Sequence, residues 1–398
     1  MTSVTTRAAV AVTCAALALP TLTSAASSAA SEARVDPTVQ SAGKGPSSWT
    51  KISKGDVSST NEPGLYRTGD GVLHVAYTQG SRMRWSNVSK HGRLVGHGTV
   101  LSGWDSLSSQ PTLIAARNNR IRVVFGGINV SGPAPYNDNG LFTSTTGRAG
   151  RSWSLARGAL LAASVATYGI GALALSGRAP IVAVAFNERI LWRQTDGSAT
   201  PIGPDNRVSN GDCCAYHSAL ARDAITGRVF LGWYSGGGAN RSGVFVKRLR
   251  PTAGPRMKAP DSSRLDTDQT VALTGRRDTP GVYAAYCTGY PNCRHVKLWR
   301  VGANRAITVP RSKNADTIAL AAAPSGGLWV TWENDVTNRV YATLTNRKAT
   351  RFGAVRVVKS AQRDTYRLAA YSGAVRHLDL VINTGANGKV TIAFRRGF

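Results

Sequence analysis

The chain has 398 residues, of which 42% are hydrophobic, so it is long enough for one large or two ordinary domains with a real core. Lysine and arginine number 49 against 21 acidic residues, which gives a formal net charge of +28. Such an excess attracts polyanions, so anionic polysaccharide, wall teichoic acid and nucleic acid are candidate partners. The alternative is a basic exported protein without a specific anionic ligand.

The first thirty residues predict a signal peptide rather than part of the fold. Arg7 supplies a positive start, an apolar run follows, and several small residues offer cleavage sites near Ala25 to Ala30. Residues 31–47 then predict a flexible lead-in. No later apolar run approaches the roughly 18 residues that a membrane helix needs. We therefore expect a secreted, extracellular protein without a membrane span.

An apolar strand that ends in a bulky residue recurs along the rest of the chain. Its seven copies end, at intervals of 46 to 61 residues, at Tyr77, Phe125, Phe186, Tyr234, Tyr286, Trp332 and Ile382. Each copy follows another apolar strand and a turn, and each is followed by a third strand. The near-continuous apolar runs indicate strands that are buried on both faces.

A fourth strand follows in six of these units, whereas the seventh stops at its third strand because the chain ends at Phe398. A spare strand, Ser48 to Ser53, precedes the first unit and can supply the strand that the seventh lacks. This closure removes an exposed sheet edge. The predicted fold is all-β: a seven-bladed β-propeller over residues 48–398, with four-stranded antiparallel blades and a ring closed by the N-terminal strand. A β-sandwich with extra strands would not explain this match between the two ends.

Two stretches relate this repeat to a known superfamily. Thr146, Gly150, Ser152 and Trp153 resemble the Asp-box of sialidases, with Arg148 in place of the acid, at the hairpin between third and fourth strands. Pro63 aligns with the proline of the sialidase Arg-Ile-Pro motif, which puts Asn61 where the arginine that grips sialate would stand. The resemblance therefore implies the propeller scaffold of the sialidase-like superfamily and does not carry over its reaction.

In a propeller, the loops that lead into the innermost strands share one face with the loops between second and third strands. From the order of the predicted strands, the residue pairs that precede the seven innermost strands are Asn61-Glu62, Ser109-Gln110, Thr167-Tyr168, Tyr216-His217, Asp268-Gln269, Ala315-Asp316 and Tyr366-Arg367. Two longer loops add Tyr136, Asp138 and Arg241. A purely structural face would be apolar here, so this polar ring, the mouth, is the predicted ligand site.

Two chemistries fit the mouth. A glycosidase needs a carboxylic acid and a base or nucleophile across the sugar, for which Glu62 with Asp316 or Asp268 would serve; a sialidase-type reaction would use a tyrosine such as Tyr366. A polysaccharide lyase needs a base, for which we consider His217 or Tyr216, and a cation that neutralises a uronate. We assign substrate binding to Arg367, Arg241, Asn61, Gln110, Tyr168 and Asp138.

The competing class is a non-catalytic propeller that binds an anionic wall polymer, a glycan or a protein. In either class we expect a monomer whose partner is acidic carbohydrate or another polyanion. Nucleic-acid binding is supported by the charge alone, because the sequence contains no recognised nucleic-acid-binding module. Nucleotide-binding and serine-esterase motifs are absent as well.

Removal of the signal peptide leaves four cysteines: Cys213, Cys214, Cys287 and Cys293. An even number in an exported chain predicts disulfides rather than metal ligation, and four cysteines allow three pairings. Adjacent cysteines are poor tetrahedral ligands, so we predict neither a metal nor another cofactor. All four cysteines fall on the mouth face, which disulfides would brace.

Overall fold

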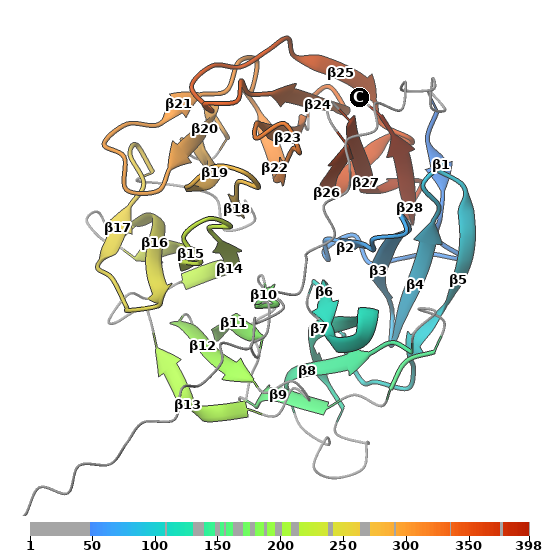
Figure 1. The fold of residues 1–398 in the computed structure, drawn as a ribbon. Helices are drawn as coiled ribbons and strands as arrows, with labels where there is room; N and C mark the ends of the chain where they lie inside the picture. The colour runs from blue at the N-terminus through green and yellow to red at the C-terminus, as the bar shows by residue number, and fades with distance from the viewer. Residues whose placement is uncertain are drawn as a thin grey trace, which may run out of the picture. The chain divides into compact units, whose positions relative to one another are not determined.

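A computed structural model describes residues 48–397 except 108–109, 130–138, 148–151, 155–156, 162–169, 176–179, 187–188, 196–200, 208–214, 238–241, 263–270, 290–291, 335 and 375–376. The predicted signal peptide and lead-in, residues 1–47, lie outside the described residues and stay predictions. Within the described residues, the strands form seven four-stranded sheets, each antiparallel throughout. The predicted seven-bladed propeller is therefore confirmed (Figure 1).

Each blade is built from consecutive strands, which are numbered outward from the central channel. Blade 1 comprises β2 (Gly64–Arg67), β3 (Leu73–Gln79), β4 (Arg82–Val88) and β5 (Leu94–Leu101). Blade 2 comprises β6 (Thr112–Ala116), β7 (Arg120–Ile128), β8 (Asn139–Thr145) and β9 (Arg157–Leu161), with a short 3-10 turn, η1 (Arg117–Asn119), between its first two strands. Blade 3 comprises β10 (Ile170–Leu173), β11 (Ile181–Phe186), β12 (Arg189–Thr195) and β13 (Pro201–Arg207).

The second half of the ring repeats this arrangement. Blade 4 comprises β14 (Ala215–Arg222), β15 (Val229–Gly237), β16 (Ser242–Arg250) and β17 (Arg256–Lys258). Blade 5 comprises β18 (Ala272–Gly275), β19 (Val282–Thr288), β20 (His295–Arg300) and β21 (Ile307–Thr308). Blade 6 comprises β22 (Ala315–Ala322), β23 (Leu328–Asn334), β24 (Arg339–Leu344) and β25 (Arg356–Lys359).

The ring closes as the sequence predicts. Blade 7 takes β26 (Asp364–Ala374), β27 (His377–Ala386) and β28 (Lys389–Arg396) from the end of the chain, and its outermost strand is β1 (Thr50–Lys51). Thr50 pairs with Phe394 in this sheet. The indole of Trp49 also donates to the carbonyl of Lys359 in blade 6 at 2.8 Å. The first described strand therefore joins the last three and covers the edge of β28.

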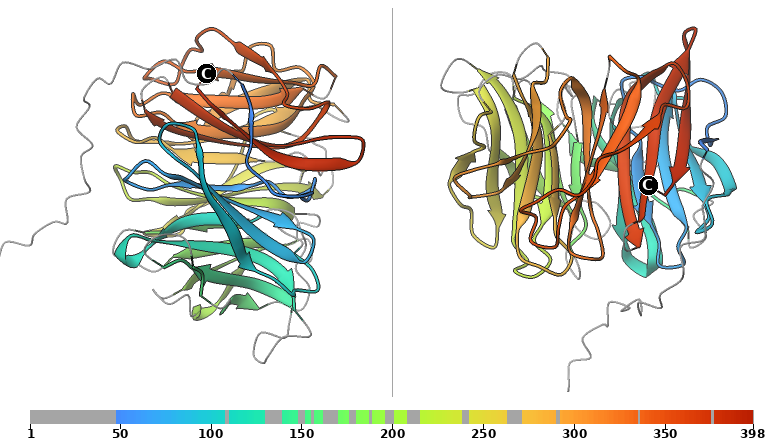
Figure 2. Two further views of the ribbon diagram at one scale, coloured as in Figure 1. Left: turned by 90° about the vertical axis from the view of Figure 1, so that its right-hand side faces the viewer. Right: turned by 90° about the horizontal axis from the view of Figure 1, so that it is seen from above.

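The core lies between neighbouring blades. The side views show the strands running along the channel axis, so that adjacent sheets face each other (Figure 2). The bulky residues that end the predicted strands are almost fully buried where their side chains are described: Tyr77, Phe125, Tyr234, Tyr286, Trp332 and Ile382. Burial on both faces explains why these second strands read as continuous apolar runs. Close packing also reaches the channel wall, since a side chain at Gly64 would clash with the backbone carbonyl of Pro111 in blade 2.

The hairpin that resembles an Asp-box has a structural counterpart in blade 6. Thr146 forms a bridge with Trp153, and its hydroxyl oxygen accepts a hydrogen bond from the Ile121 amide at 2.9 Å. Thr345 and Phe352 form the same bridge, and the Thr345 hydroxyl accepts from the Leu328 amide at 2.9 Å. Arg148 and Gly150 lie outside the described residues. The blade 6 copy cannot be recognised from the sequence, because only its threonine and an aromatic residue match the motif.

Candidate functional site

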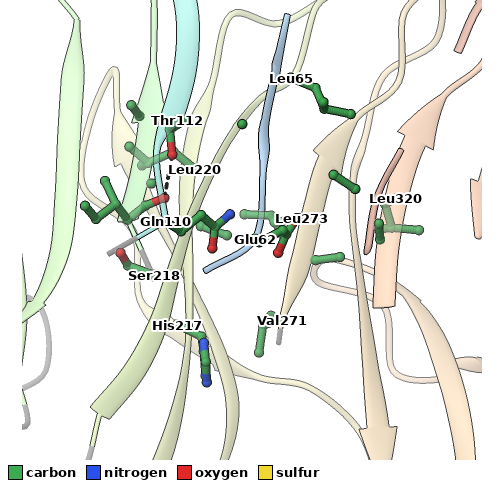
Figure 3. Close-up of a pocket in the computed structure, with 18 of the residues that line it drawn as sticks. Glu62, Leu65, Gln110, Thr112, His217, Ser218, Leu220, Val271, Leu273 and Leu320 are labelled. Carbon is green, nitrogen blue, oxygen red and sulfur yellow. Dashed lines mark hydrogen bonds between the residues drawn. The ribbon is translucent and has the colours of Figure 1, made fainter. Parts of the chain in front are cut away.

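A cavity of about 300 Å³ occupies the central channel and is bordered by the inner strands of the blades. Its polar lining includes Glu62, Gln110, Thr112, His217 and Ser218. Apolar side chains line it as well, among them Leu65, Leu220, Val271, Leu273 and Leu320. Figure 3 shows Glu62 and Gln110 near the middle of the cavity, with His217 toward one end, Leu65 toward the other and Leu320 to one side. Three residues of the predicted mouth, Glu62, Gln110 and His217, are thus brought together.

Glu62 is held in the cavity by its neighbours in the chain. Asn61, before it, is buried and donates from its amide to the Thr78 hydroxyl at 2.9 Å and to the Leu107 carbonyl at 3.2 Å. The Asn61 carbonyl accepts a hydrogen bond from Asn383 of blade 7 at 2.8 Å. Pro63 follows and restricts the backbone. Asn61 is therefore bonded to blade 1, to the segment before blade 2 and to blade 7. The position of Glu62, the next residue, depends on the closed ring.

Burial raises the pKa of Glu62 to about 8, against an ordinary value of 4.5. The cause is desolvation by burial; the residue is half-buried, and the lining of its cavity includes several leucine and alanine residues. The positive charge of Arg367 acts in the opposite direction and is the weaker effect. The Glu62 carboxyl is therefore mostly protonated at neutral pH, and it is a proton donor rather than a fixed negative charge.

Three inner strands contain one extra residue at their mouth end. The register between β14 and β15 shifts from Tyr216 to Ala219, that between β22 and β23 shifts from Ala315 to Ile318, and that between β26 and β27 shifts from Thr365 to Arg367. Such β-bulges turn side chains away from the regular alternation of a strand and are frequent beside active sites. The mouth is thus irregular in the same way in blades 4, 6 and 7.

The bulge in blade 4 places His217 in the cavity. His217 has a φ of 55°, in the left-handed region that few residues other than glycine adopt, and it is 8% exposed. The same bulge brings Ser218 into the lining. A strained backbone at a polar cavity is a feature of functional sites, because folding alone does not favour it.

Arg367 spans the junction between blades 7 and 1. Its Nε donates to the Thr60 carbonyl at 3.1 Å, and its Nη1 donates to the Tyr366 carbonyl at 2.9 Å. Thr60 lies two residues before Glu62, which explains why the guanidinium affects the pKa of that carboxyl. The predicted cation of the mouth is therefore close to the predicted acid.

Other predicted residues lie elsewhere. The ring of Tyr216 stacks on Tyr234, with centroids 6.4 Å apart, and packs against the core of blades 4 to 6. Tyr366 packs against the core between blades 7 and 1. Asp316 lies in the bulge of β22, outside the residues that line the cavity. These orientations could not be predicted from the order of the strands, because one extra residue in a strand moves the following side chains to its other face.

Several predictions fall outside the described residues: Asp268, Arg241, Tyr168, Asp138, Cys213 and Cys214. Their roles stay predictions. The other two cysteines form the disulfide Cys287–Cys293, with Cα atoms 5.2 Å apart. It joins the end of β19 to the residues before β20, in the mouth-side loop of blade 5. The predicted presence of a disulfide is therefore confirmed for two of the four cysteines.

The far end of the inner strands contrasts with the mouth. Arg67, at the end of β2, forms an ion pair with Asp379 of blade 7, and its guanidinium carbon lies 5.4 Å from the ring centroid of Tyr371. The guanidinium carbon of Arg277 in blade 5 lies 5.8 Å from the same ring, and Arg277 donates to the Ser372 carbonyl. These contacts tie blade 7 to two blades, of which blade 5 is not its neighbour.

The described residues contain no group of three or more His, Cys, Asp or Glu residues that could hold a metal ion. No helix among them is long and apolar enough to cross a membrane.

Solved structures with the same architecture include enzymes and a lectin that are described as binding or cleaving carbohydrate. An ulvan lyase of polysaccharide lyase family 25 is 10% identical, with a TM-score of 0.54 over 87% of this chain and 95% of that one. The NanB sialidase of Streptococcus pneumoniae is 8% identical, with a TM-score of 0.51 over 88% of this chain and 70% of that one. The chain has the propeller fold of these enzymes.

The SapL1 lectin, solved with a methyl fucoside, is 17% identical with a TM-score of 0.50, over 77% of this chain and 97% of the lectin. Identities this low show the fold alone, and the same scaffold serves a lyase, a hydrolase and a binding protein. No protein-family model and no curated protein matches the sequence. The function of the propeller must therefore be argued from its own cavity.

Proposed function

We propose that this protein is an exported carbohydrate-active enzyme that cleaves an acidic, uronate-containing polysaccharide at the mouth, with Glu62 as general acid. The observation that carries the proposal is the position of Glu62 in the channel cavity with a pKa of about 8. A carboxyl that stays protonated near neutral pH can donate a proton to a leaving glycosidic oxygen.

The described lining favours elimination over hydrolysis. It contains one carboxyl group, Glu62, and one imidazole, His217, whereas glycosidases of the common type need two carboxyl groups. Tyr366, the candidate nucleophile of a sialidase-type reaction, packs against the core. Hydrolysis would need a second acid from the part of the mouth outside the described residues, where Asp268 and Asp138 belong.

The elimination uses Glu62 and His217 of the cavity lining and the neighbouring Arg367. Arg367 neutralises the uronate carboxylate, which makes the proton on the adjacent carbon more acidic. His217 takes that proton as base, and the electron pair forms a carbon–carbon double bond as the bond to the glycosidic oxygen breaks. The leaving oxygen takes the proton of Glu62. The products are a new reducing end and an unsaturated uronate.

The test is a panel of neutral, sialylated and uronate-containing glycans incubated with purified mature protein. New reducing ends and ultraviolet absorbance from unsaturated uronate are followed together. Both signals on uronate polymers support elimination. Reducing ends without absorbance would mean a hydrolase, and no signal on any glycan would contradict catalysis and favour a non-catalytic binding protein.

A further inference from the structure

Three stretches of the chain carry many cations and no anion. Residues 224–260 contain seven Lys and Arg, residues 279–315 contain six, and residues 336–363 contain seven, without a single Asp or Glu. These stretches include the outer two strands of blades 4, 5 and 6: β16 and β17, β20 and β21, and β24 and β25. In Figure 1 the three pairs follow one another along the outer edge of the ring, in yellow to orange. We call this surface the basic rim.

Cations of the basic rim stand opposite one another. Arg339 pairs with Lys359 across β24 and β25, and both residues are exposed. In blade 4, Lys247 pairs with Arg256 across β16 and β17. Like charges directly opposite each other in a sheet repel, so this arrangement costs stability in the free protein. An anion that lies along the strands would remove the repulsion.

Blade 6 adds a concave site to this charge. A hollow of about 360 Å³ is lined by Trp329, Leu344, Phe352, Arg351 and Arg356, among others. It lies beside the turn between β24 and β25, at the end of the blade opposite the mouth. An apolar wall with cations at its edge suits a sugar ring that carries a carboxylate or a sulfate.

The Arg356 side chain and the turn beside the hollow are held in place. The guanidinium carbon of Arg356 lies 5.7 Å from the ring centroid of Trp329. The side-chain oxygen of Asn346 accepts hydrogen bonds from the amides of Thr350 at 2.9 Å and Arg351 at 3.3 Å, which fixes the turn. Little order then has to be imposed on these groups when an anion binds.

We propose that the basic rim binds an anionic polysaccharide, with the blade 6 hollow holding one of its sugar units. A nucleic acid would gain affinity by stacking its bases on exposed aromatic side chains. The large exposed hydrophobic residues in the described part of the chain are Leu94, Val95, Ile225 and Val336, none of them aromatic, and Trp329 is 1% exposed. The surface therefore fits a polymer that is recognised by its charge. The proposal concerns binding and does not rest on catalysis at the mouth.

The experiment compares two variants of the mature protein that lose the same charge. The rim variant carries Arg347→Gln, Lys348→Gln, Arg351→Gln and Arg356→Gln. The control variant carries Lys51→Gln, Arg82→Gln, Lys90→Gln and Arg93→Gln, outside the rim. All eight residues are exposed, so both variants should fold, which thermal unfolding checks. The Kd for polygalacturonate is measured at low and at physiological salt.

We expect the rim variant to bind roughly tenfold more weakly at low salt, and the control to change by less than about threefold. A charge-preserving variant with Arg347→Lys, Arg351→Lys and Arg356→Lys should keep most of the affinity. Equal losses in the two Gln variants would show that only net charge matters and would overturn the proposal. Tighter binding of a single-stranded oligonucleotide than of polygalacturonate would also overturn it.

The same titration with Glu62→Gln separates this proposal from the proposed function. That variant should cleave about 10²- to 10⁴-fold more slowly and keep the rim affinity. If wild-type protein binds polygalacturonate through the rim without cleaving it, the proposed function fails and this inference stands. If it cleaves the polymer and the rim variant binds as well as the wild type, the inference fails and the function stands.

Discussion

Both ends of the inner strands have a buried or half-buried carboxyl group beside an arginine, yet the two groups are treated in opposite ways. At the far end, Asp379 is paired with Arg67, and Nε2 of His377 lies 3.4 Å from its other oxygen. At the mouth, the Glu62 carboxyl forms no hydrogen bond or ion pair with the described residues. Arg367 donates from Nε and Nη1 to backbone carbonyls instead.

The presence or absence of a partner distinguishes a carboxylate that stabilises the fold from a carboxyl group that can act as an acid. A buried carboxylate that is paired fixes the strands that carry it, whereas removal of its partner costs several kcal/mol. A carboxyl that is desolvated without a pair takes up a proton instead, and it gains the pKa that acid catalysis needs. The comparison predicts that substitutions at the mouth change activity, while substitutions at the far end change stability.

The largest effect is expected for Glu62→Gln. It should lower kcat by about 10²- to 10⁴-fold, because the leaving oxygen loses its proton donor. The unfolding free energy at pH 8 should rise, on the order of 1–3 kcal/mol, since the neutral amide pays no ionisation cost. Initial rates and thermal unfolding measure the two quantities, and Asp56→Asn, at an exposed position, is the matched control. Unchanged turnover would break the comparison.

The sign of the pH effect follows from the raised pKa of Glu62. Its stabilising contribution is fully present below the ordinary value of 4.5 and is lost as the pH rises through about 8. Activity should fall over the same upper range, because the ionised carboxyl cannot donate a proton. The pH–rate profile of the wild type should therefore fall with a pKa near 8. If the residual activity of Glu62→Gln lacks this fall, Glu62 is the general acid.

At the far end, Asp379→Asn should destabilise the fold by about 3 kcal/mol, because Arg67 is left buried without its anion. The turnover of the folded protein should stay at the wild-type value. Chemical denaturation and rates corrected for the folded fraction test both statements. A loss of turnover with normal stability would mean that the far end takes part in the reaction.

Replacement of the disulfide should have a smaller effect. The variant with Cys287→Ser and Cys293→Ser should lose about 2 kcal/mol of stability, because a loop of six residues closes little chain entropy. Since the bond braces the mouth face, the Michaelis constant should change more than it does for Asp379→Asn. An unchanged melting temperature would show that the strands of blade 5 hold this loop without the bond.

The smallest effect tests the cause of the raised pKa itself. Leu273→Asn places a polar group in the cavity wall, so the carboxylate of Glu62 is better solvated and its pKa falls by about one unit. The upper limb of the rate profile should move to lower pH by the same amount. A limb that stays near 8 would mean that desolvation by this wall does not control the acid.

The sequence by itself determined the ring. The repeat of apolar strands predicts the seven blades. The spare strand around Trp49 matches the strand that the last blade lacks, and this match predicts a closed ring. The sequence put Glu62, Gln110 and His217 on one face because they lie near the starts of inner strands, and all three line the cavity. The sequence predicted disulfides among four cysteines but left three pairings open, and only the structure shows the pair Cys287–Cys293.

Only the tertiary structure decided which side chains enter the cavity. The extra residues in β14, β22 and β26 leave no mark in the hydrophobic pattern, yet they put Ser218 into the lining and Tyr216 and Tyr366 against the core. The raised pKa of Glu62 follows from its burial, in a cavity whose lining residues come from blades that are far apart in the chain. Such a shift is a property of the assembled ring, because desolvation requires all the walls to be present at once.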